Sequence, residues 1–333
     1  MTINSFKQRS NPLNLKRTLL GSGDSGNIIA LLVFWIFLIA ISAVNNAQFI
    51  SKTTFNAVVF NMCILGILAI GQALVVLSGG ILDLSLSVPL ILSGCLSVIF
   101  YDRGWSTIPL ILASIFISGL FGLINAFFIV VMKINPLIVT LGTGFAGSGL
   151  LLIIFSRAMV NPKSWIAGFG TSYTFKVPSA WWPMLIFTVI AHIFVKYSRP
   201  GRHLVAVGGN PVAAKVSGIS LARYRVGTFF AASLISGTAG IVYAAFTPEI
   251  RPSAGTLYTL PMIAAVVLAG FSLAGGAGNF LALFISVGFL STVPTALVFF
   301  GLESLWEPFF QGLILIVAVS LDAVRTKKSG NRE

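Results

Sequence analysis

The chain has 333 residues, of which 56% are hydrophobic and only 9% are charged. Soluble domains carry about 25% charged residues, and a soluble domain of this size still leaves roughly a quarter of its unfolded surface in water. The composition therefore excludes an ordinary soluble protein and predicts a polytopic membrane protein whose apolar surface is covered by the lipid bilayer.

The net charge of +13 arises from 21 Lys and Arg residues against 8 Asp and Glu residues. Basic residues collect in the cytoplasmic loops of membrane proteins, and the chain lacks the interleaved basic and aromatic residues of a nucleic-acid-binding surface. We therefore expect no nucleic-acid partner. Cys63 and Cys95 both fall inside apolar runs, which favours small buried side chains over a disulfide or a metal site.

The apolar runs predict an all-α integral membrane protein, a polytopic bundle of about ten transmembrane helices. A span needs about 20 mostly apolar residues. The third, fifth and eighth candidate spans are shorter or interrupted by Gly, Pro and Ser. Eight spans with additional re-entrant segments are therefore the alternative, and this even number would also place both termini on the same side of the membrane. The candidate spans are residues 28–44, 56–78, 84–101, 108–132, 136–156, 181–196, 226–247, 259–275, 280–300 and 304–322.

The basic residues predict the orientation of this bundle. With ten spans and both termini in the cytoplasm, the 21 Lys and Arg residues divide 15 inside to 6 outside, as expected for cytoplasmic loops. Residues 1–27 then form a basic cytoplasmic tail before an uncleaved first helix. Residues 28–324 form the transmembrane domain, and residues 325–333 form a second basic cytoplasmic tail.

The longest internal cytoplasmic loop, residues 197–225, predicts a short helix outside the membrane. Asn210 suits the N-cap and Pro211 the first helical position. Gly218 suits the left-handed residue that ends a helix, and Lys215 lies near the negative end of the helix dipole. A helix of about two turns is not stable alone in water, so it either rests on the protein's own spans or docks to a cytoplasmic partner.

Five stretches resemble, in the same order, the permease subunits of ABC importers of the ribose/xylose/galactose type. The likeness covers roughly residues 55–324, and the second-to-last stretch and the loop stretch are its most specific parts. The stretches are GQALVVLSGGILDLSLSV (71–88), INPLIVTLGT (134–143), GRHLVAVGGNPVAAKVSGISLARYRV (201–226), AAVVLAGFSLAGGAGNF (264–280) and FFQGLILIVAVSLDAV (309–324).

The resemblance implies a set of partners in the bacterial inner membrane. Two permease subunits, identical or closely related, would form the pore, and a periplasmic sugar-binding protein would deliver the substrate. A cytoplasmic ATPase would grip the loop helix of each subunit as a coupling helix. The ATP would be bound by that ATPase, because this chain has no GxxxxGK[ST] motif and no cofactor is implied. The implied coupling residues are Gly208, Gly209, Asn210, Pro211, Ala213, Ala214, Lys215, Ser217 and Gly218.

The segment around Asp83 departs from the family pattern. The family usually reads GGIDLSVGS, whereas this chain has an extra Leu82 before Asp83 and no Gly after Asp-Leu-Ser. A carboxylate near hydrocarbon costs about 2.5–3.5 kcal/mol on insertion scales. Asp83 is therefore either the N-cap of the third span, assisted by Ser85, or a gating residue in the pathway, or both.

Polar side chains within the apolar runs are candidates for lining the passage. Sugar hydroxyls need amide and hydroxyl partners, and a passage with little fixed charge suits a neutral solute. The same side chains are also typical of hydrogen bonds that join membrane helices. The candidates are Asn61, Gln72, Asp83, Ser85, Asn125, Thr140, Thr143 and Gln311, while His192 lacks an acidic partner at helical spacing.

Four charged residues near the expected outer surface, Glu249, Arg251, Glu303 and Glu307, are candidates for contacts with the binding protein. Exposed charges at span ends are also common without any partner. The GxGxxG pattern at residues 142–147 lies in an apolar run rather than in a βαβ unit, so it indicates close helix packing instead of a dinucleotide site.

Other functional classes are less compatible with these patterns. An importer of branched-chain amino acids or nucleosides is the nearest alternative, but a charged substrate favours a fixed positive charge in the pathway, and no Lys or Arg falls inside a span apart from Lys196, the last residue of the sixth. An ion-coupled secondary transporter would need carboxylate relays or a clear inverted repeat. An intramembrane enzyme would need a catalytic constellation, and no His-Glu-x-x-His or nucleophile–base pair is present.

Overall fold

The computed structural model describes residues 24–160, 172–175, 177–179 and 181–330. Most of the expected N-terminal tail and residues 331–333 of the C-terminal tail therefore lie outside the described residues. The α-helices are α2 (Asp24–Asn45), α3 (Lys52–Leu77), α4 (Ser87–Asp102), α5 (Thr107–Ala126), α6 (Pro136–Ile154), α7 (Trp181–Tyr197), α8 (Arg199–Gly209), α9 (Pro211–Val216), α10 (Leu221–Phe246), α11 (Thr256–Leu268), α12 (Phe280–Phe299) and α13 (Glu307–Gly330).

Short elements connect these helices. A π-helical turn, η2 (Phe127–Val131), continues α5. Strand β1 pairs with β4 and strand β2 pairs with β3, both antiparallel and two residues long. The all-α prediction did not include these strands. The remaining elements are the 3-10 helices η1 (Ala47–Ile50), η3 (Pro252–Gly255) and η4 (Ser304–Trp306), and the strands β1 (Met159–Val160), β2 (Tyr173–Thr174), β3 (Val177–Pro178) and β4 (Glu249–Ile250).

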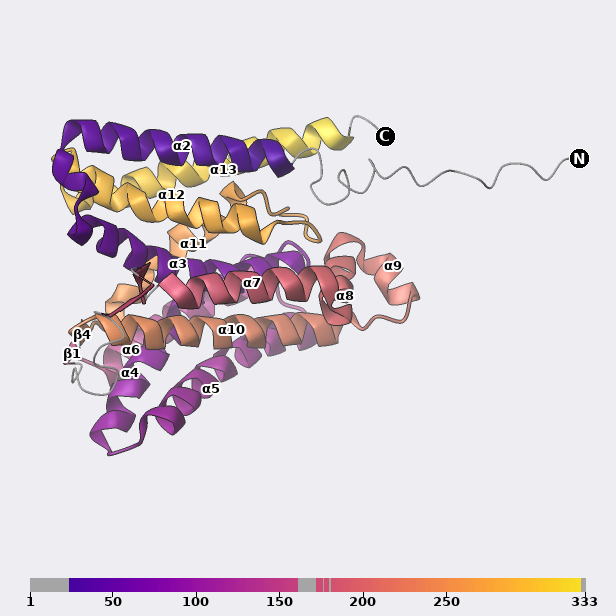
Figure 1. Ribbon diagram of the computed structural model, residues 1–333. Coiled ribbons are helices and arrows are strands. Elements are labelled where there is room, and N and C mark those ends of the chain that lie inside the picture. The colour runs from indigo at the N-terminus through magenta and orange to yellow at the C-terminus, as the bar shows by residue number, and fades with distance from the viewer. Residues whose placement is uncertain (1–23, 161–171, 176, 180, 331–333) are drawn as a thin grey trace, which may run out of the picture.

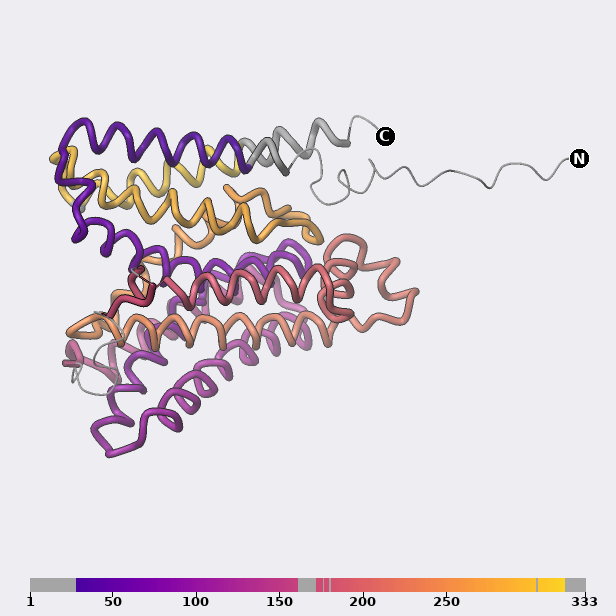
Figure 2. Tube along the Cα trace, in the orientation of Figure 1, coloured from indigo at the N-terminus to yellow at the C-terminus, as the bar shows by residue number. Residues whose placement is uncertain are grey.

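Within the described residues, six helices are long and apolar enough to cross a membrane, namely α2, α3, the α5–η2 unit, α6, α10 and α12. A seventh span is possible if α7 and α8, which meet at 76° (Figure 2), count as one. The other three expected spans contain the shorter apolar helices α4, α11 and α13. Each expected span thus contains a helix, but ten crossings remain a prediction.

Two of the expected spans are shorter than the sequence suggested. At 1.5 Å per residue, the 16 residues of α4 extend about 24 Å and the 13 residues of α11 about 20 Å, less than the hydrocarbon thickness. Helix α4 begins at Ser87, not at residue 84, and α11 ends at Leu268, not at residue 275. Gly270, with φ of 83°, lies just beyond the end of α11 in the left-handed conformation that glycine favours.

The helices run roughly side by side, so the bundle has two ends (Figure 1). The first, here called the α9 end, carries α8, α9, the start of α2 and the end of α13. The second, here called the β4 end, carries β1, β4 and η4. Lys196 lies in the last turn of α7 at the α9 end, whereas Glu249 lies in β4. The first and last described helices thus begin and end at the α9 end, and the location of both termini in the cytoplasm remains a prediction.

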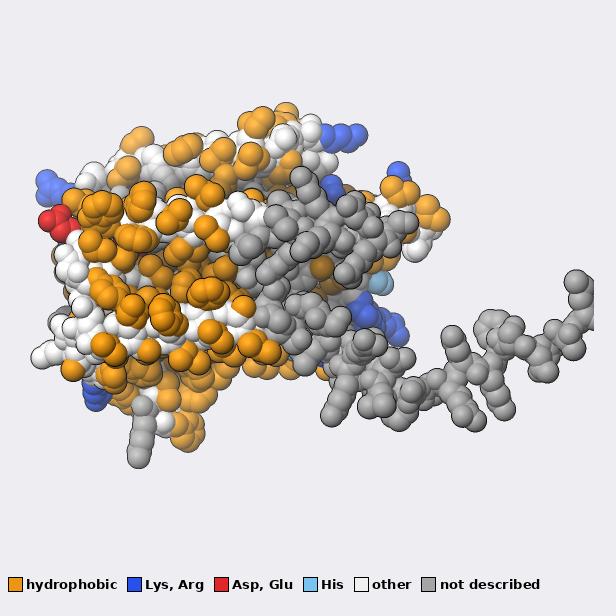
Figure 3. Space-filling model, turned by 90° about the horizontal axis from the view of Figure 1, so that it is seen from above, with side chains coloured by type: hydrophobic (Ala, Val, Ile, Leu, Met, Phe, Trp, Pro, Cys, Tyr) orange, Lys and Arg blue, Asp and Glu red, His pale blue; other side chains and the backbone are white. Residues whose placement is uncertain are grey.

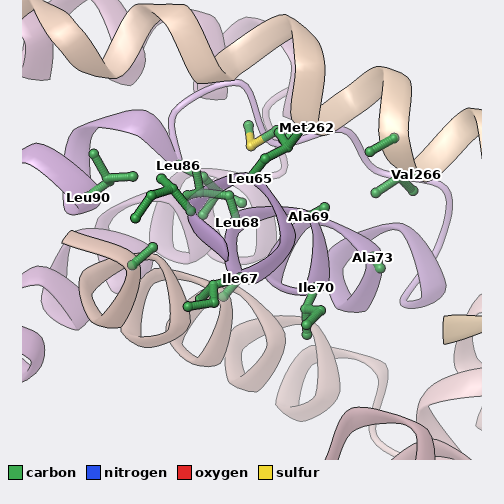
Figure 4. Close-up of a cluster of buried hydrophobic side chains, with 14 of the residues drawn as sticks. Leu65, Ile67, Leu68, Ala69, Ile70, Ala73, Leu86, Leu90, Met262 and Val266 are labelled. Atoms are coloured by element: carbon green, nitrogen blue, oxygen red, sulfur yellow. The ribbon is translucent and has the colours of Figure 1, made fainter. Parts of the chain in front are cut away.

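Helix α3 is the centre of the bundle. Of the residues in an apolar 18-residue stretch of α3, 83% are buried, whereas only 11% are buried in the corresponding stretch of α2. A helix that is hydrophobic on all sides is expected in such a position. Side chains radiate from α3 towards α4 and α11 in Figure 4, where the labelled residues are Leu65, Ile67, Leu68, Ala69, Ile70, Ala73, Leu86, Leu90, Met262 and Val266.

The outer surface between the two ends is apolar. Phe34, Ile36 and Phe37 of α2 are each more than 60% exposed, as are Ile153 of α6 and Ile316 of α13. Hydrophobic side chains cover much of the face seen in Figure 3, and charged side chains gather towards its ends. This distribution fits a multi-pass membrane protein whose sides contact lipid acyl chains.

Helix α10 packs against α4 and α5 through small residues. A Cβ atom on Gly122 of α5 would overlap the carbonyl oxygen of Phe229, and one on Gly240 would overlap that of Leu90. The Ser236 hydroxyl donates to the carbonyl oxygen of Leu86 at 2.5 Å. Small residues let backbones approach closely in membranes, where hydrocarbon offers helices little hydrophobic reason to associate.

We expect Gly122→Ala to destabilise the protein, because the added methyl meets the backbone of α10. Overpacking of this kind typically costs about 1–3 kcal/mol. Gly149→Ala in α6 is the control, since a Cβ there meets nothing within 4 Å and alanine favours a helix by up to about 1 kcal/mol. Thermal unfolding of the purified protein in detergent at one heating rate should give a lower midpoint only for Gly122→Ala. Equal midpoints would contradict close packing of α5 on α10.

Candidate functional site

The expected site residues divide into three groups in the structure. One group builds the loop around α9, a second forms a buried polar network around Asp83, and a third lines a cavity nearer the β4 end.

The loop expected at residues 197–225 contains α9 as a capped helix. The Asn210 side chain accepts a hydrogen bond from the Ala213 N–H at 2.9 Å, and Pro211 occupies the first turn. At the other end Gly218 has φ of 79°, and the Ile219 N–H donates to the Ala214 carbonyl oxygen at 2.9 Å. These contacts confirm the local helix that the sequence predicted. The loop also contains α8, which the sequence analysis did not anticipate.

Helix α9 has one face against the protein and one face in the open. Ala214 is only 4% exposed, whereas Val212 and Val216 are 74% and 84% exposed. Because these valines are four residues apart, they lie on the same face of the helix. The helix therefore packs on the protein through Ala214, as expected of a connector, and also exposes an apolar face, as expected of a docking element.

The end of α8 meets two other segments in a close backbone junction. A Cβ on Gly208 would overlap the carbonyl oxygen of Leu77 at the end of α3 and would lie 2.6 Å from the Gly276 nitrogen. The Gly276 N–H donates to the same Leu77 carbonyl at 3.2 Å. We call these three residues, with Gly80 and Gly275, the glycine junction. It links α3, α8 and the loop between α11 and α12.

A buried chain of hydrogen bonds connects Asp83 to α5 and α6. Asp83 Oδ1 accepts from the Ser85 N–H at 2.8 Å and from the Ser85 hydroxyl at 2.6 Å. Asn125 Nδ2 donates to Ser85 Oγ at 2.7 Å, and the Thr143 hydroxyl donates to Asn125 Oδ1 at 2.7 Å. The Thr140 hydroxyl donates to the carbonyl oxygen of Leu82 at 3.3 Å. Residues from three separate runs of sequence thus form one polar network.

Gln72 of α3 joins the same network through the backbone. Its side-chain amide oxygen accepts from the Asp83 N–H at 3.0 Å, and its amide nitrogen donates to the Asp83 carbonyl oxygen at 3.0 Å. Asp83 does not cap α4 directly, because Leu86 occupies the N-cap and makes no side-chain cap bond. Its carboxylate instead closes the turn that precedes the helix. Its second oxygen, Oδ2, is buried and has no hydrogen-bond partner among the described residues.

A cavity of about 190 Å³ lies between α3, α11, α12 and α13. Asn61 and Gln311 from the expected pathway line it, together with Glu307, which the sequence analysis placed at the outer surface. Gln311 Nε2 donates to Glu307 Oε1 at 2.8 Å. The described lining residues include side chains with hydroxyl, amide and carboxyl groups, and none of them is basic.

Several residues of this cavity were not predicted from the sequence. Tyr258 and Ser291 supply hydroxyl groups, and Pro261 and Pro294 lie inside α11 and α12. A proline within a span was the available signal, because it removes a backbone hydrogen bond and bends the helix away from its neighbour.

The remaining candidates lie elsewhere. Glu249 and Arg251 form an ion pair at the β4 end, with Arg251 Nε 2.6 Å from Glu249 Oε1. Glu303 is exposed near the same end, and His192 is half-buried on α7. Cys63 and Cys95 are both buried and unbridged, as expected of small core side chains. The Gly147 backbone packs against Val88, which agrees with a packing role for the GxGxxG pattern.

If the carboxylate closes the turn through Oδ1, Asp83→Asn should retain the fold because the amide oxygen can accept the same two bonds. Asp83→Ala should lower the thermal midpoint, because it leaves the buried Ser85 N–H and hydroxyl without an acceptor at about 1–3 kcal/mol. Asp102→Asn, at the exposed far end of α4, is the control. Equal losses in the two Asp83 variants would show that the negative charge, rather than the turn, is what the protein needs.

Comparison with known proteins places the chain among transport permeases. The family described as the permease component of branched-chain amino acid transport systems matches residues 54–319. The ribose import permease protein RbsC of Bacillus subtilis is 32% identical over 294 residues, which cover 86% of this chain and 89% of that protein. No solved structure matches the chain significantly.

Two further relatives have similar extents. The galactose/methyl galactoside import permease protein MglC of Haemophilus influenzae is 28% identical over 316 residues, covering 88% of this chain and 93% of that protein. The autoinducer 2 import system permease protein LsrC of an Enterobacter species is 28% identical over 307 residues, covering 92% of this chain and 88% of that protein. These matches and the apolar helices together show that the chain belongs to the branched-chain amino acid transport system permease family, as a multi-pass protein of the inner membrane.

Proposed function

We propose that this protein is the permease subunit of an ABC importer for a monosaccharide. The observation that carries the proposal is the similarity to import permeases for ribose and for galactose over 86–90% of the chain. The cavity supports it, because amide and hydroxyl groups suit the hydroxyls of a neutral sugar. A branched-chain amino acid, which the family description names, is a zwitterion. Its ammonium group could meet Glu307, but no basic lining residue would pair with its carboxylate.

The proposed subunit works by moving solute and breaks no bond itself. ATP would bind to a separate ATPase subunit that docks on the α9 end, where Val212 and Val216 offer an apolar face. A sugar-binding protein would meet the β4 end near Glu249, Arg251 and Glu303. A second permease subunit, identical or related, would complete the pore.

The glycine junction gives the coupling proposal a physical route. Helix α9 follows α8 after a single residue, Asn210, and α8 ends against Leu77 and Gly276. Leu77 ends α3, and Gly276 lies in the loop that joins α11 to α12. Because α3, α11 and α12 all line the cavity, a movement of α9 would displace all three walls. The close backbone contacts leave little room for that movement to be absorbed locally.

The substrate proposal is tested by uptake into proteoliposomes that contain the permease, its ATPase and its binding protein. We expect ATP-dependent uptake of labelled ribose or galactose that excess leucine does not inhibit. Asn61→Ala and Gln311→Ala should each raise the KM for uptake about two- to twelve-fold, the equivalent of a lost hydrogen bond of ~0.5–1.5 kcal/mol. Gln48→Ala, an exposed site outside the cavity, is the control. Uptake of leucine in place of both sugars would contradict the proposal.

The coupling route is tested by two neighbouring glycines in α8. Gly208→Ala should reduce uptake roughly two- to thirty-fold, the effect of ~0.5–2 kcal/mol along a coupling route, while the ATPase stays bound. Gly209→Ala should leave uptake near normal, because its Cβ would lie 3.8 Å from Gly276 Cα, an ordinary contact. Co-purification of the ATPase with each variant separates coupling from assembly. Normal uptake by Gly208→Ala would remove the junction from the route.

A further inference from the structure

A second, larger cavity of about 720 Å³ opens at the α9 end. It lies where η2 gives way to α6 and where the chain passes from α9 into α10. Its position differs from that of the sugar cavity, which lies between α3, α11, α12 and α13. The lining residues are Ile129, Val130, Lys133, Ile134, Asn135, Pro136, Lys215, Ile219, Ser220, Leu221, Ala222 and Arg225.

The charge of this cavity is positive and uncompensated. Lys133, Lys215 and Arg225 line it from three different segments, and among its described lining residues none is acidic. Arg225 Nε is buried and finds no hydrogen-bond partner within the described chain. A buried guanidinium nitrogen without an acceptor is unfavourable unless a ligand supplies one. Three cationic side chains that line one cavity, one of them with an unsatisfied donor, indicate an anionic ligand.

The backbone at the cavity is held in unusual conformations. Lys133 has φ of 58°, one of two described non-glycine residues with positive φ. It follows the π-helical turn η2, and the Ile134 N–H reaches back to the Phe128 carbonyl oxygen at 3.1 Å. Left-handed non-glycine residues and π-helical turns both concentrate at functional positions. Here the two features together place the Lys133 side chain at the cavity.

The surroundings identify the source of the anion. Ile129, Val130 and Ile134 form an apolar wall, and next to them Val131 and Met132 are 63% and 53% exposed. Exposed side chains of this kind face acyl chains on a membrane protein. A free ion or an acidic protein surface would have no use for such a wall, whereas a phospholipid has a phosphate for the cations and acyl chains for the apolar side. Basic pockets between membrane helices bind anionic headgroups in this way.

We propose that this cavity binds the phosphate of an anionic phospholipid, held by Lys133, Lys215 and Arg225, with the acyl chains along η2 and the start of α6. Such a lipid would supply the hydrogen-bond acceptor that Arg225 Nε lacks. It would also hold the first turns of α10 at the membrane surface.

Native mass spectrometry of the full-length permease tests the proposal with three added probes: phosphatidylglycerol, phosphatidylcholine and inorganic phosphate. We expect phosphatidylglycerol to remain bound in preference to the other two. Arg225→Gln and Lys133→Asn should each weaken its binding about five-fold, the effect of one basic group near a charged membrane surface. Asparagine tolerates the left-handed conformation of residue 133, so Lys133→Asn tests the charge without disturbing the backbone. Arg103→Gln, exposed at the far end of α4, should change nothing.

Three outcomes would overturn the proposal. Equal retention of phosphatidylcholine would show that the headgroup charge is not recognised. Binding of inorganic phosphate with the same dependence on Arg225 and Lys133 would assign the cavity to a free anion. Unchanged phosphatidylglycerol binding in both variants, with crosslinking of this wall to the ATPase, would assign the cations to an acidic surface of that partner.

Discussion

Close approach between backbones is the constraint on which this structure depends. Helices surrounded by acyl chains gain little by hiding apolar side chains from one another, so association rests on van der Waals contact and on hydrogen bonds. Gly122 and Gly240 provide that contact on either side of α10, and Gly208 provides it where α8 meets α3. In each place an added methyl group would overlap a carbonyl oxygen. The same device that holds the bundle together therefore also joins α9 to the helices around the cavity.

The buried polar network adds specificity to this packing. Gln72, Asp83, Asn125 and Thr143 come from four parts of the chain, and their hydrogen bonds require one register between α3, the turn before α4, α5 and α6. The additional Leu82, which departs from the family pattern, takes part through its carbonyl oxygen. The insertion is thus accommodated by a hydrogen bond rather than by disorder of the turn. These hydrogen bonds give the four side chains a structural role, although Asp83 Oδ2 lacks a partner among the described residues, and a contribution to the pathway stays a prediction.

The local features of the fold could be predicted because they depend on neighbouring residues. The cap of α9 by Asn210 and its end at Gly218 follow from side-chain and backbone chemistry within ten residues. The early end of α11 was missed although Gly and Ser interrupt this candidate span, because such residues alone do not fix where a helix ends. In the structure Gly270 has φ of 83°, and the Gly275 backbone closely approaches Gly79 and Gly80 beyond the end of α3. Asn61 and Gln311 could be named as polar residues, but their meeting in one cavity depends on packing between distant helices.

The two cavities are mechanically related through Arg225. This residue lines the basic cavity, and its Nη2 lies 3.3 Å from where a Cβ on Gly79 would stand, two residues beyond the end of α3. A phosphate that holds Arg225 would therefore restrain the segment next to the glycine junction, while Lys215 of α9 contacts the same space. If the lipid binds more tightly when α9 is in one position than in another, the bound lipid stabilises the first position by the same free energy, because linkage is reciprocal. On the proposed function, a headgroup at this site would bias the conformational equilibrium that the ATPase would drive, without any contact with the sugar.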